Sequence, residues 1–181
     1  EIMFGLNMVV HKGKTIFVGD TSVHEYPTSE QMAEIAISTA RVVRLFGFEP
    51  KVAFVSHSTF GQPLTSRTKH IRKAVDILKE QKVDFEFDGD MQPDVALDSE
   101  YKELYPFSNI VGKANILIMP GQHSAAISYK MMKTLGDTKV IGPLLIGLGL
   151  PIEIAPLRSS TSELINLASV AAYSADIIDY K

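Results

Sequence analysis

The chain has 181 residues, 45% of them hydrophobic, a formal net charge of −3 and a pI near 6.0. This composition supports a sizeable core and argues against a general nucleic-acid binder. No cysteine is present, which excludes disulfides, thiolate nucleophiles and cysteine-ligated zinc. No apolar run reaches transmembrane length and no secretory signal opens the chain, so we expect a cytoplasmic protein without a membrane partner. Because it opens as "EIMFGLNMVV", almost inside a strand, we expect a fragment of a longer polypeptide.

Strand-like and helical segments alternate along the chain. Two strand-like runs separated by "HKGK" predict an antiparallel hairpin over 3–10 and 15–19. Thr28 and Gln31 stand at capping-box spacing before a helix that Gly47 ends. Apolar periodicity predicts three further helices, over 65–81, 123–135 and 161–175. Short apolar runs predict four further strands, over 51–56, 85–89, 114–120 and 142–149.

This alternation predicts an α/β domain whose mainly parallel sheet is covered by helices on both faces. Ligands of such sheets bind at the carboxyl ends of the strands. That rule selects the loops 56–66, 88–98 and 120–125 as the place of a binding site. The last helix, 161–175, is apolar almost all round, so we expect it to pack in a core or against a partner chain.

Two features near the first of these loops are typical of anion binding. Ser56, Ser58, Thr59 and Gly61 follow a buried strand and precede a helix, which suits a phosphate oxygen, but an ordinary polar loop explains them equally well. The helix begins "RTKHIRK", so Arg67 and four more basic side chains crowd the end where the helix dipole disfavours cations. Such a run is either a solvated face or the sign of a polyphosphate ligand.

Other patterns argue against metals and dinucleotides. "DFEFDGDMQPD" fails the EF-hand spacing, because Pro93 stands where that calcium loop needs glycine and Ser99 where it needs glutamate. We therefore expect no metal, and expect the aspartates of this segment to cap turns or line a polar cleft; they are Asp88, Asp90 and Asp94. The five histidines show no ligand spacing, although His57 and His123 lie in loops expected at the same strand ends. "GLGLP" over 147–151 lacks the GxGxxG pattern of dinucleotide binding.

The segment "IEIAPLRSSTSELINLA" (152–168) leads from a strand-like run through a small polar loop into the last helix. Ser160 and Glu163 stand at capping-box spacing, so Glu163 is either a helix cap or, beside an anion loop, a general base. Arg158 either clamps a phosphate or pairs with a surface acid. The sequence pattern alone leaves both choices open.

Five segments run in order along almost the whole chain: "FVGDTSVHEYPTSEQMAEIAI", "GFEPKVAFVSHSTFG", "FDGDMQPDVAL", "GKANILIMP" and "IGPLLIGLGLPIEI". Together they resemble the phosphate acetyl/butyryl transferase family. The resemblance implies a phosphotransacetylase fold, similar to that of the isocitrate and isopropylmalate dehydrogenases. A family domain is longer and two-lobed. The resemblance therefore implies that residues 1–181 are its C-terminal portion, with a core lobe over about 1–150 and a loop and helix over 151–181 that return to the missing lobe.

Within the family, "HEYPTSEQMAEIAI", "VSHSTFG" and "LRSSTSELIN" are most similar to the C-terminal domain of hybrid NADP-dependent malic enzymes. That resemblance implies an upstream malic enzyme domain, with NADP and a divalent metal bound outside this chain. It implies that this domain holds no cofactor, binds acetyl-CoA, and regulates the conversion of malate to pyruvate and CO₂ without transferring acyl groups. Family members generally assemble as dimers, which implies a homodimer or larger homo-oligomer.

The expectation that this domain is inactive rests on the C-terminal loop. Active family members have a serine and an arginine there, which place the phosphate and stabilise charge, and an aspartate, which helps deprotonate the CoA thiol. Aligned on "LIN", this sequence has Pro156, Leu157 and Glu163 at those positions. Loss of one such group can cost about 10²–10³ in rate. Arg158 is one residue late, and a local slip would return its guanidinium to the site.

The binding loops match the family's sequence more closely than the C-terminal loop does. "SHSTFG" matches the family's serine-rich loop, and "PGQHSAAISYK" matches its Pro-Asp-Leu-Asn-Thr-Gly-Asn segment in part. We assign binding of acyl-CoA or phosphate to ten residues. They are Ser56, Ser58, Thr59, Gly61, Arg67, Gln122, His123, Ser124, Arg158 and Ser159.

Two other functions stay open. One is an active phosphate acetyl- or butyryltransferase, in which CoA thiolate attacks acetyl phosphate and Glu163 and Arg158 are catalytic. The other is an oligomerisation module, suggested by the apolar helix over 161–175 and by a hairpin that reads as exposed.

Overall fold

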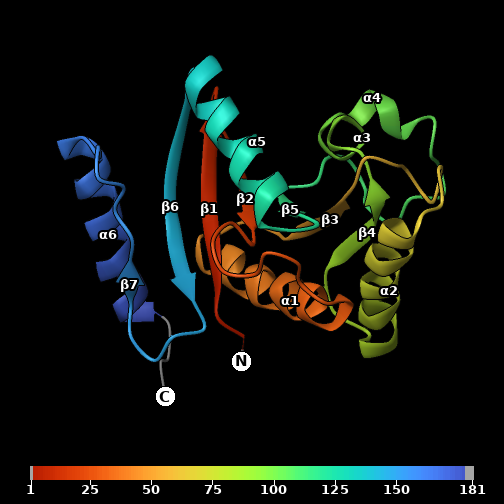
Figure 1. The fold of residues 1–181 in the computed structure, drawn as a ribbon, viewed down its shortest axis with the longest axis horizontal. Coiled ribbons are helices and arrows are strands. Elements are labelled where there is room, and N and C mark those ends of the chain that lie inside the picture. Colours follow the sequence, from red (N-terminus) through yellow and green to blue (C-terminus); the bar gives the residue numbers. More distant parts are fainter. Residues whose placement is uncertain (1, 178–181) are drawn as a thin grey trace.

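Within residues 2–177, which this computed structural model describes, one seven-stranded sheet forms the centre of the molecule (Figure 1). Its strands are β1 (Phe4–His11), β2 (Lys14–Gly19), β3 (Lys51–Val55), β4 (Glu86–Met91), β5 (Ile116–Ile118), β6 (Thr138–Ile146) and β7 (Ile152–Glu153). They lie in the order β4-β3-β5-β2-β1-β6-β7. Only β1 and β7 run against the common direction, since β1 is antiparallel to both its neighbours and β6 is antiparallel to β7. The predicted mainly parallel sheet is confirmed.

Helices cover both faces of this sheet, as predicted. They are α1 (Ser29–Leu45), α2 (Ser66–Gln81), α3 (Pro93–Leu97), α4 (Ser99–Lys102), α5 (Gln122–Leu135) and α6 (Thr161–Ile177). Side chains of a strand alternate between its two faces. Along β3, Val52 and Phe54 accordingly join the core beneath α1 and α2, while Ala53 and Val55 join the core beneath α3 and α5.

The first helix begins and ends as the sequence predicts. Thr28 Oγ1 accepts from Gln31 N at 3.1 Å, and Gln31 Oε1 accepts from Thr28 N at 2.8 Å. This reciprocal pair satisfies two backbone N–H groups that the helix itself leaves unpaired. α1 ends at Leu45, and Gly47 follows with a φ of +82°, a left-handed conformation that glycine adopts without strain.

Two predictions about the strands are wrong because they depend on distant pairing. The hairpin is not exposed: β1 lies between β2 and β6, and its Phe4 and Leu6 are fully buried. The strand predicted over 142–149 starts four residues earlier, at Thr138, and follows β1 from the pair Phe4–Ile146 to the pair His11–Thr138. Its polar start shows no local strand signal.

Two shorter segments also differ from prediction. The strand predicted over 114–120 is reduced to β5, Ile116–Ile118. The second half of the predicted loop 88–98, together with the residues after it, forms the short helices α3 and α4. Helices of one turn are too short to show apolar periodicity.

The last helix packs only partly in the core: Leu167 belongs to the core beneath α1 and α2, and Val170 packs against that core. The other expectation, packing against a partner chain, stays a prediction. Among the residues whose burial is described in α6, only Leu167 and Ser174 are buried, while Leu164 and Ile165 are 47% and 60% exposed. Tyr173 attaches the helix to α1, because its hydroxyl donates to Leu45 O at 3.0 Å. Within the described part of the chain, no helix has the length and hydropathy needed to cross a membrane.

Candidate functional site

A cavity of about 500 Å³ lies at the carboxyl ends of β3 and β5. All three loops selected from the sequence reach it, and so does the segment that follows β2. The lining residues are Glu25, Tyr26, Val55, Ser56, His57, Arg67, Ile71, Pro93, Met119, Pro120, Gly121, His123, Ser124 and Ser128. The prediction that His57 and His123 lie at the same strand ends is confirmed. Below, this space is called the strand-end cavity.

The start of α5 forms one wall of the strand-end cavity. Gly121 precedes the helix where the backbone passes close by: a Cβ there would stand 2.4 Å from Glu25 O. No acidic side chain occupies the first turn of α5, and Ser124 Oγ donates to Gly121 O at 2.8 Å. Gln122 N already donates to His24 O at 3.2 Å, but the start of a helix carries partial positive charge, so this wall favours an anion.

Cationic and aromatic side chains form the rim of the strand-end cavity. The Arg67 guanidinium lies 4.7 Å from the centre of the Tyr26 ring, a cation–π contact. The His123 ring is nearly parallel to Tyr26, and its Nε2 lies 3.5 Å from Glu25 Oε1. Because these side chains are exposed, Arg67 can reach a ligand phosphate, and the flat rings offer surfaces for a ligand's apolar or aromatic parts.

The basic start of α2 is explained mainly by partners within the chain. His70 Nε2 lies 2.9 Å from Pro27 O, Arg72 Nη1 lies 3.5 Å from Asp90 Oδ1, and Lys73 Nζ lies 2.6 Å from Glu30 Oε1. Of the five basic residues in this run, all of which the structure describes, Arg67 is the one that lines the cavity. The polyphosphate interpretation therefore concerns Arg67 and stays a prediction.

Ser58, Thr59 and Gly61 do not line the strand-end cavity. Asp90 accepts hydrogen bonds from Ser58 Oγ and, at 2.9 Å, from Gly61 N. Thr59 Oγ1 accepts from Gln92 N at 3.2 Å. Their polar groups thus fold the loop against the end of β4, and of this loop it is Ser56 and His57 that face the cavity.

The aspartates of the calcium-like segment take the turn-capping role expected of them. Asp88 accepts from Gly89 N at 2.9 Å and from Asn109 N at 2.7 Å. Asp94 Oδ1 accepts from Val95 N at 3.0 Å in the first turn of α3.

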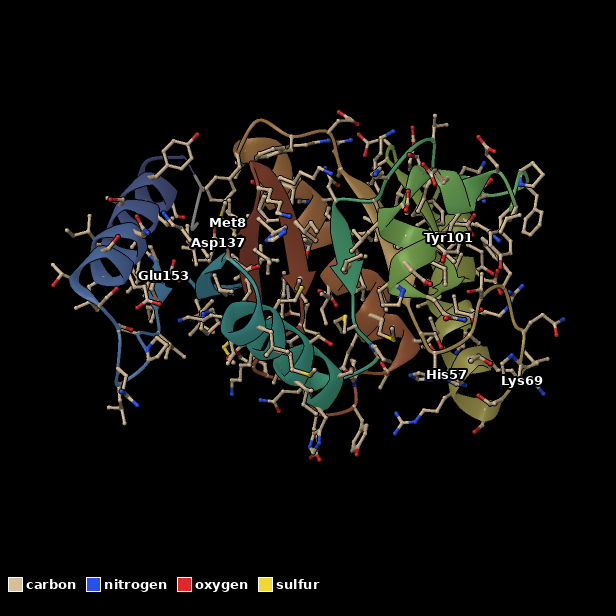
Figure 2. All side chains as sticks on the ribbon, turned by 90° about the horizontal axis from the view of Figure 1, so that it is seen from above. Met8, His57, Lys69, Tyr101, Asp137 and Glu153 are labelled. Carbon is tan, nitrogen blue, oxygen red and sulfur yellow. The ribbon has the colours of Figure 1, made fainter. Side chains whose placement is uncertain are left out.

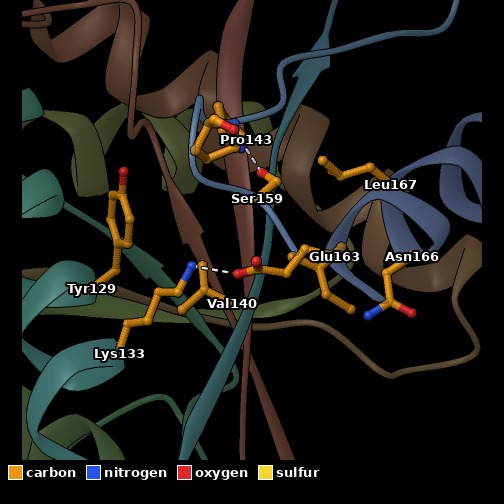
Figure 3. Close-up of a pocket in the computed structure, with 11 residues that line it drawn as sticks. Tyr129, Lys133, Val140, Pro143, Ser159, Glu163, Asn166 and Leu167 are labelled. Atoms are coloured by element: carbon orange, nitrogen blue, oxygen red, sulfur yellow. Dashed lines mark hydrogen bonds and ion pairs between the residues drawn. The ribbon is translucent and has the colours of Figure 1, made fainter. Parts of the chain in front are cut away.

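A second, smaller pocket holds two of the three predicted site residues of the C-terminal segment (Figure 3). Ser159 and Glu163 line it together with Tyr129 and Lys133 of α5. This second pocket lies beside β6. In the sheet, β1 and β2 separate β6 from β5, whose carboxyl end lies at the strand-end cavity. Figure 2 likewise shows Glu153, just before this segment, on the opposite side of the molecule from His57.

Glu163 is engaged twice within this second pocket. Its Oε2 accepts from Ser160 N at 2.8 Å, and Glu163 N donates back to Ser160 Oγ at 3.3 Å, so the predicted capping box is confirmed. Its Oε1 accepts from Lys133 Nζ at 2.5 Å. The hydrogen bond from Lys133, followed by those from Ser160, lowers the pKa of Glu163 to about 2. A carboxylate with so low a pKa is a weak base at neutral pH.

A model of the phosphate acetyl/butaryl transferase family matches residues 1–172. The chain belongs to this family. It is 46% identical over 173 residues to an NADP-dependent malic enzyme of Rhizobium meliloti, covering 96% of this chain and 23% of that protein. It is 35% identical over 162 residues to a phosphate acetyltransferase of Clostridium acetobutylicum, covering 88% of this chain and 49% of that one.

A solved structure agrees with this family assignment. The phosphotransacetylase from Streptococcus pyogenes superimposes with a TM-score of 0.90 at 30% identity, covering 97% of this chain and 54% of that chain. The phosphotransacetylase fold predicted from the sequence is therefore confirmed. The chain spans about a quarter of the length of the Rhizobium malic enzyme and about half that of the phosphotransacetylase.

The structure thus divides the predicted family site into separate groups. Ser56, Arg67, His123 and Ser124 meet at the strand-end cavity. Gln122 lies just beside it, where its Nε2 donates to Ser22 O at 3.1 Å. The C-terminal group lies apart from them: Ser159 Oγ donates to Pro156 O at 2.8 Å, and Arg158 is exposed.

Sequence reasoning missed Glu25 and Tyr26, which line the strand-end cavity. They follow a turn held by the buried Asp20, which accepts from Gly5 N at 2.8 Å and from His24 N at 2.8 Å. The run Asp-Thr-Ser after β2 was an available signal, since such residues favour turns at strand ends.

Proposed function

We propose that this chain is an acyl-CoA-binding regulatory domain of an NADP-dependent malic enzyme, and that it does not itself transfer acyl groups. The observation that carries the proposal is the separation of the strand-end cavity from the C-terminal segment. The cavity combines a helix start, Arg67 and hydroxyl groups, which suit a phosphorylated ligand. The 46% identity to an NADP-dependent malic enzyme favours a regulatory setting over a stand-alone transferase.

The state of the C-terminal segment supports the absence of transfer. The positions that the family resemblance gives to a serine and an arginine hold Pro156 and Leu157, and Leu157 is fully exposed. Glu163, at the aspartate position, caps its own helix and binds Lys133. Its lowered pKa leaves it little tendency to take a proton from a CoA thiol near neutral pH.

The proposed parent enzyme converts malate and NADP to pyruvate, CO₂ and NADPH, with NADP and a divalent metal bound upstream of this chain. To regulate that reaction, acetyl-CoA must bind one arrangement of the assembly more tightly than another, because equal affinity for both shifts nothing. We further propose that residues 1–181 complete a two-lobed domain in a homodimer or larger homo-oligomer. On this view 151–181 contact the lobe outside this chain, which the exposed face of α6 supports.

The test is malate oxidation by the full-length protein, followed as NADPH absorbance with and without acetyl-CoA. We expect acetyl-CoA to slow the reaction, with equimolar acetate as the control ligand that leaves the rate unchanged. A rate that does not respond to acetyl-CoA at saturating concentration contradicts a regulatory role.

The second candidate is an active phosphate acetyltransferase, favoured by the 35% identity to the clostridial enzyme of that name. The same full-length protein is mixed with acetyl phosphate and CoA, and acetyl-CoA formation is measured. Robust formation that is lost in Arg158→Ala or Glu163→Gln would establish this function in place of the first.

A further inference from the structure

We propose that Asp90, which lies outside the strand-end cavity, is the positioning residue that holds the loop 56–62 in its ligand-binding shape. This inference rests on the proposed function, because it takes the acyl-CoA to bind in that cavity. The loop 56–62 is called the serine loop below.

Asp90 gathers several residues of the serine loop around one buried carboxylate. Its side chain is fully buried at the end of β4. One carboxylate oxygen accepts from Ser58 Oγ, and the other accepts from Gly61 N at 2.9 Å. The backbone oxygen of Asp90 accepts from Phe60 N at 2.6 Å. A buried carboxylate without such partners would be costly, so the loop and the carboxylate stabilise each other.

The serine loop needs this support because of its backbone conformation. Phe60 and Gly61 have φ values of 50° and +81°, so two successive residues are in the left-handed region. A non-glycine residue in that region is strained and persists only where its surroundings impose it. The N–H groups of these same two residues are the ones that Asp90 binds.

The serine loop connects Asp90 to the ligand side. It begins with Ser56 and His57, which line the cavity, and it leads into α2, which carries Arg67. Asp90 also contacts α2 directly, since Arg72 Nη1 lies 3.5 Å from its Oδ1. One carboxylate therefore faces both the loop and the helix that present groups to the cavity.

Asp88 provides a matched comparison on the same strand. It is also a buried carboxylate, 5% exposed, and it accepts from Gly89 N and Asn109 N. Those residues do not line the strand-end cavity. Asp88→Asn thus removes the same charge from the same strand without touching the serine loop.

The experiment compares Asp90→Asn with Asp88→Asn in the full-length protein. Titration calorimetry measures the dissociation constant for acetyl-CoA, and amide hydrogen exchange measures the opening of the serine loop. We expect Asp90→Asn to weaken binding about tenfold and to speed exchange at Phe60 and Gly61, because charged partners of buried groups are lost. Asp88→Asn should leave both within about twofold of wild type. Unchanged binding in Asp90→Asn, or equal weakening in both variants, overturns the inference.

If Asp90→Asn does not fold, Arg72→Met replaces it, with Lys69→Met as the control that removes the same charge from an exposed position of α2. The inference is supported if Arg72→Met speeds exchange at Gly61 and weakens binding while Lys69→Met does neither. Equal effects of Arg72→Met and Lys69→Met overturn it. Wild-type protein that does not bind acetyl-CoA overturns the proposed function instead. The exchange comparison then decides alone whether Asp90 holds the loop.

Discussion

The strand-end cavity and the C-terminal segment differ in how firmly the rest of the chain holds them. Around the cavity, the serine loop is fixed by the buried Asp90, and β3 beneath it is buried on both faces. In the C-terminal segment, Ile152, Ile154 and Leu157 are 46%, 47% and 107% exposed. This chain's own core therefore sets the geometry of the cavity, whereas few contacts with that core fix the C-terminal segment.

The largest expected effect comes from removing core beneath the cavity. Phe54→Ala should lower the free energy of unfolding by about 3–5 kcal/mol, because Phe54 is fully buried in β3. Leu164→Ala on α6, at a side chain 47% exposed, should change it by no more than about 0.5 kcal/mol. Urea unfolding of both variants checks this, and similar losses at the two sites would contradict the difference between the regions.

A glycine substitution gives the next largest effect. Gly121→Ala should lower the free energy of unfolding by about 1–3 kcal/mol, because the new Cβ would meet Glu25 O at 2.4 Å. It should also weaken acetyl-CoA binding, since the segment that carries Glu25 and the start of α5 both line the cavity. Gly149→Ala, just before the C-terminal segment, is the control, because apart from its chain neighbours no atom of the described residues lies within 4 Å of its Cβ position. Thermal unfolding measures the loss of stability, and calorimetry measures the loss of binding. Equal losses in the two variants would contradict the difference between the cavity and the C-terminal segment.

Glu153 is a half-buried acid on the C-terminal side. Its Oε2 is buried without a hydrogen-bond partner among the described residues, and burial raises the pKa of Glu153 from 4.5 to about 7. The folded state therefore binds the proton more tightly, so stability falls as pH rises from about 4.5 through 7.

Glu153→Gln carries no charge to bury and should not show this fall. Allowing for solvent screening of a half-exposed group, we expect it to be about 1 kcal/mol more stable than wild type at pH 8 and equal to it at pH 4. Chemical unfolding at the two pH values checks this, and an equal difference at both would exclude titration of Glu153 as the cause.

The smallest effect is expected at Glu163. Its pKa is lowered to about 2, so its contribution to stability is present above the unfolded pKa of about 4.5 and is lost as pH falls towards 2. Because solvent screens this partly exposed group, Glu163→Gln should lower the unfolding temperature at pH 7 by no more than about 2 °C, and should leave it unchanged near pH 2. Thermal scans against pH measure it. A large drop at pH 7 would show that the C-terminal segment is more firmly held than its exposure indicates.

Local sequence signals predicted the parts of the fold that local chemistry determines. The capping boxes at Thr28 and Ser160 and the end of α1 before Gly47 are examples. Pairing between distant strands was not predictable in this way. The polar start of β6 becomes a strand because Thr138 pairs with His11 on β1.

The same distinction applies to the candidate site. The rule that ligands bind at the carboxyl ends of parallel strands located the strand-end cavity correctly. It could not tell which hydroxyls face the cavity, because Asp90 is 32 residues from Ser58 along the chain. Likewise, a basic run cannot reveal that Arg72 and Lys73 have acidic partners on other elements.

The most direct test is calorimetric titration of acetyl-CoA into the full-length protein and its Arg67→Ala, Lys69→Ala and Arg158→Ala variants. Arg67 lines the strand-end cavity, whereas Lys69 lies on the same helix outside it. We predict binding by the wild type and by Lys69→Ala, and at least about tenfold weaker binding by Arg67→Ala. Binding that survives Arg67→Ala but is lost in Arg158→Ala would place the ligand at the C-terminal segment and contradict the account.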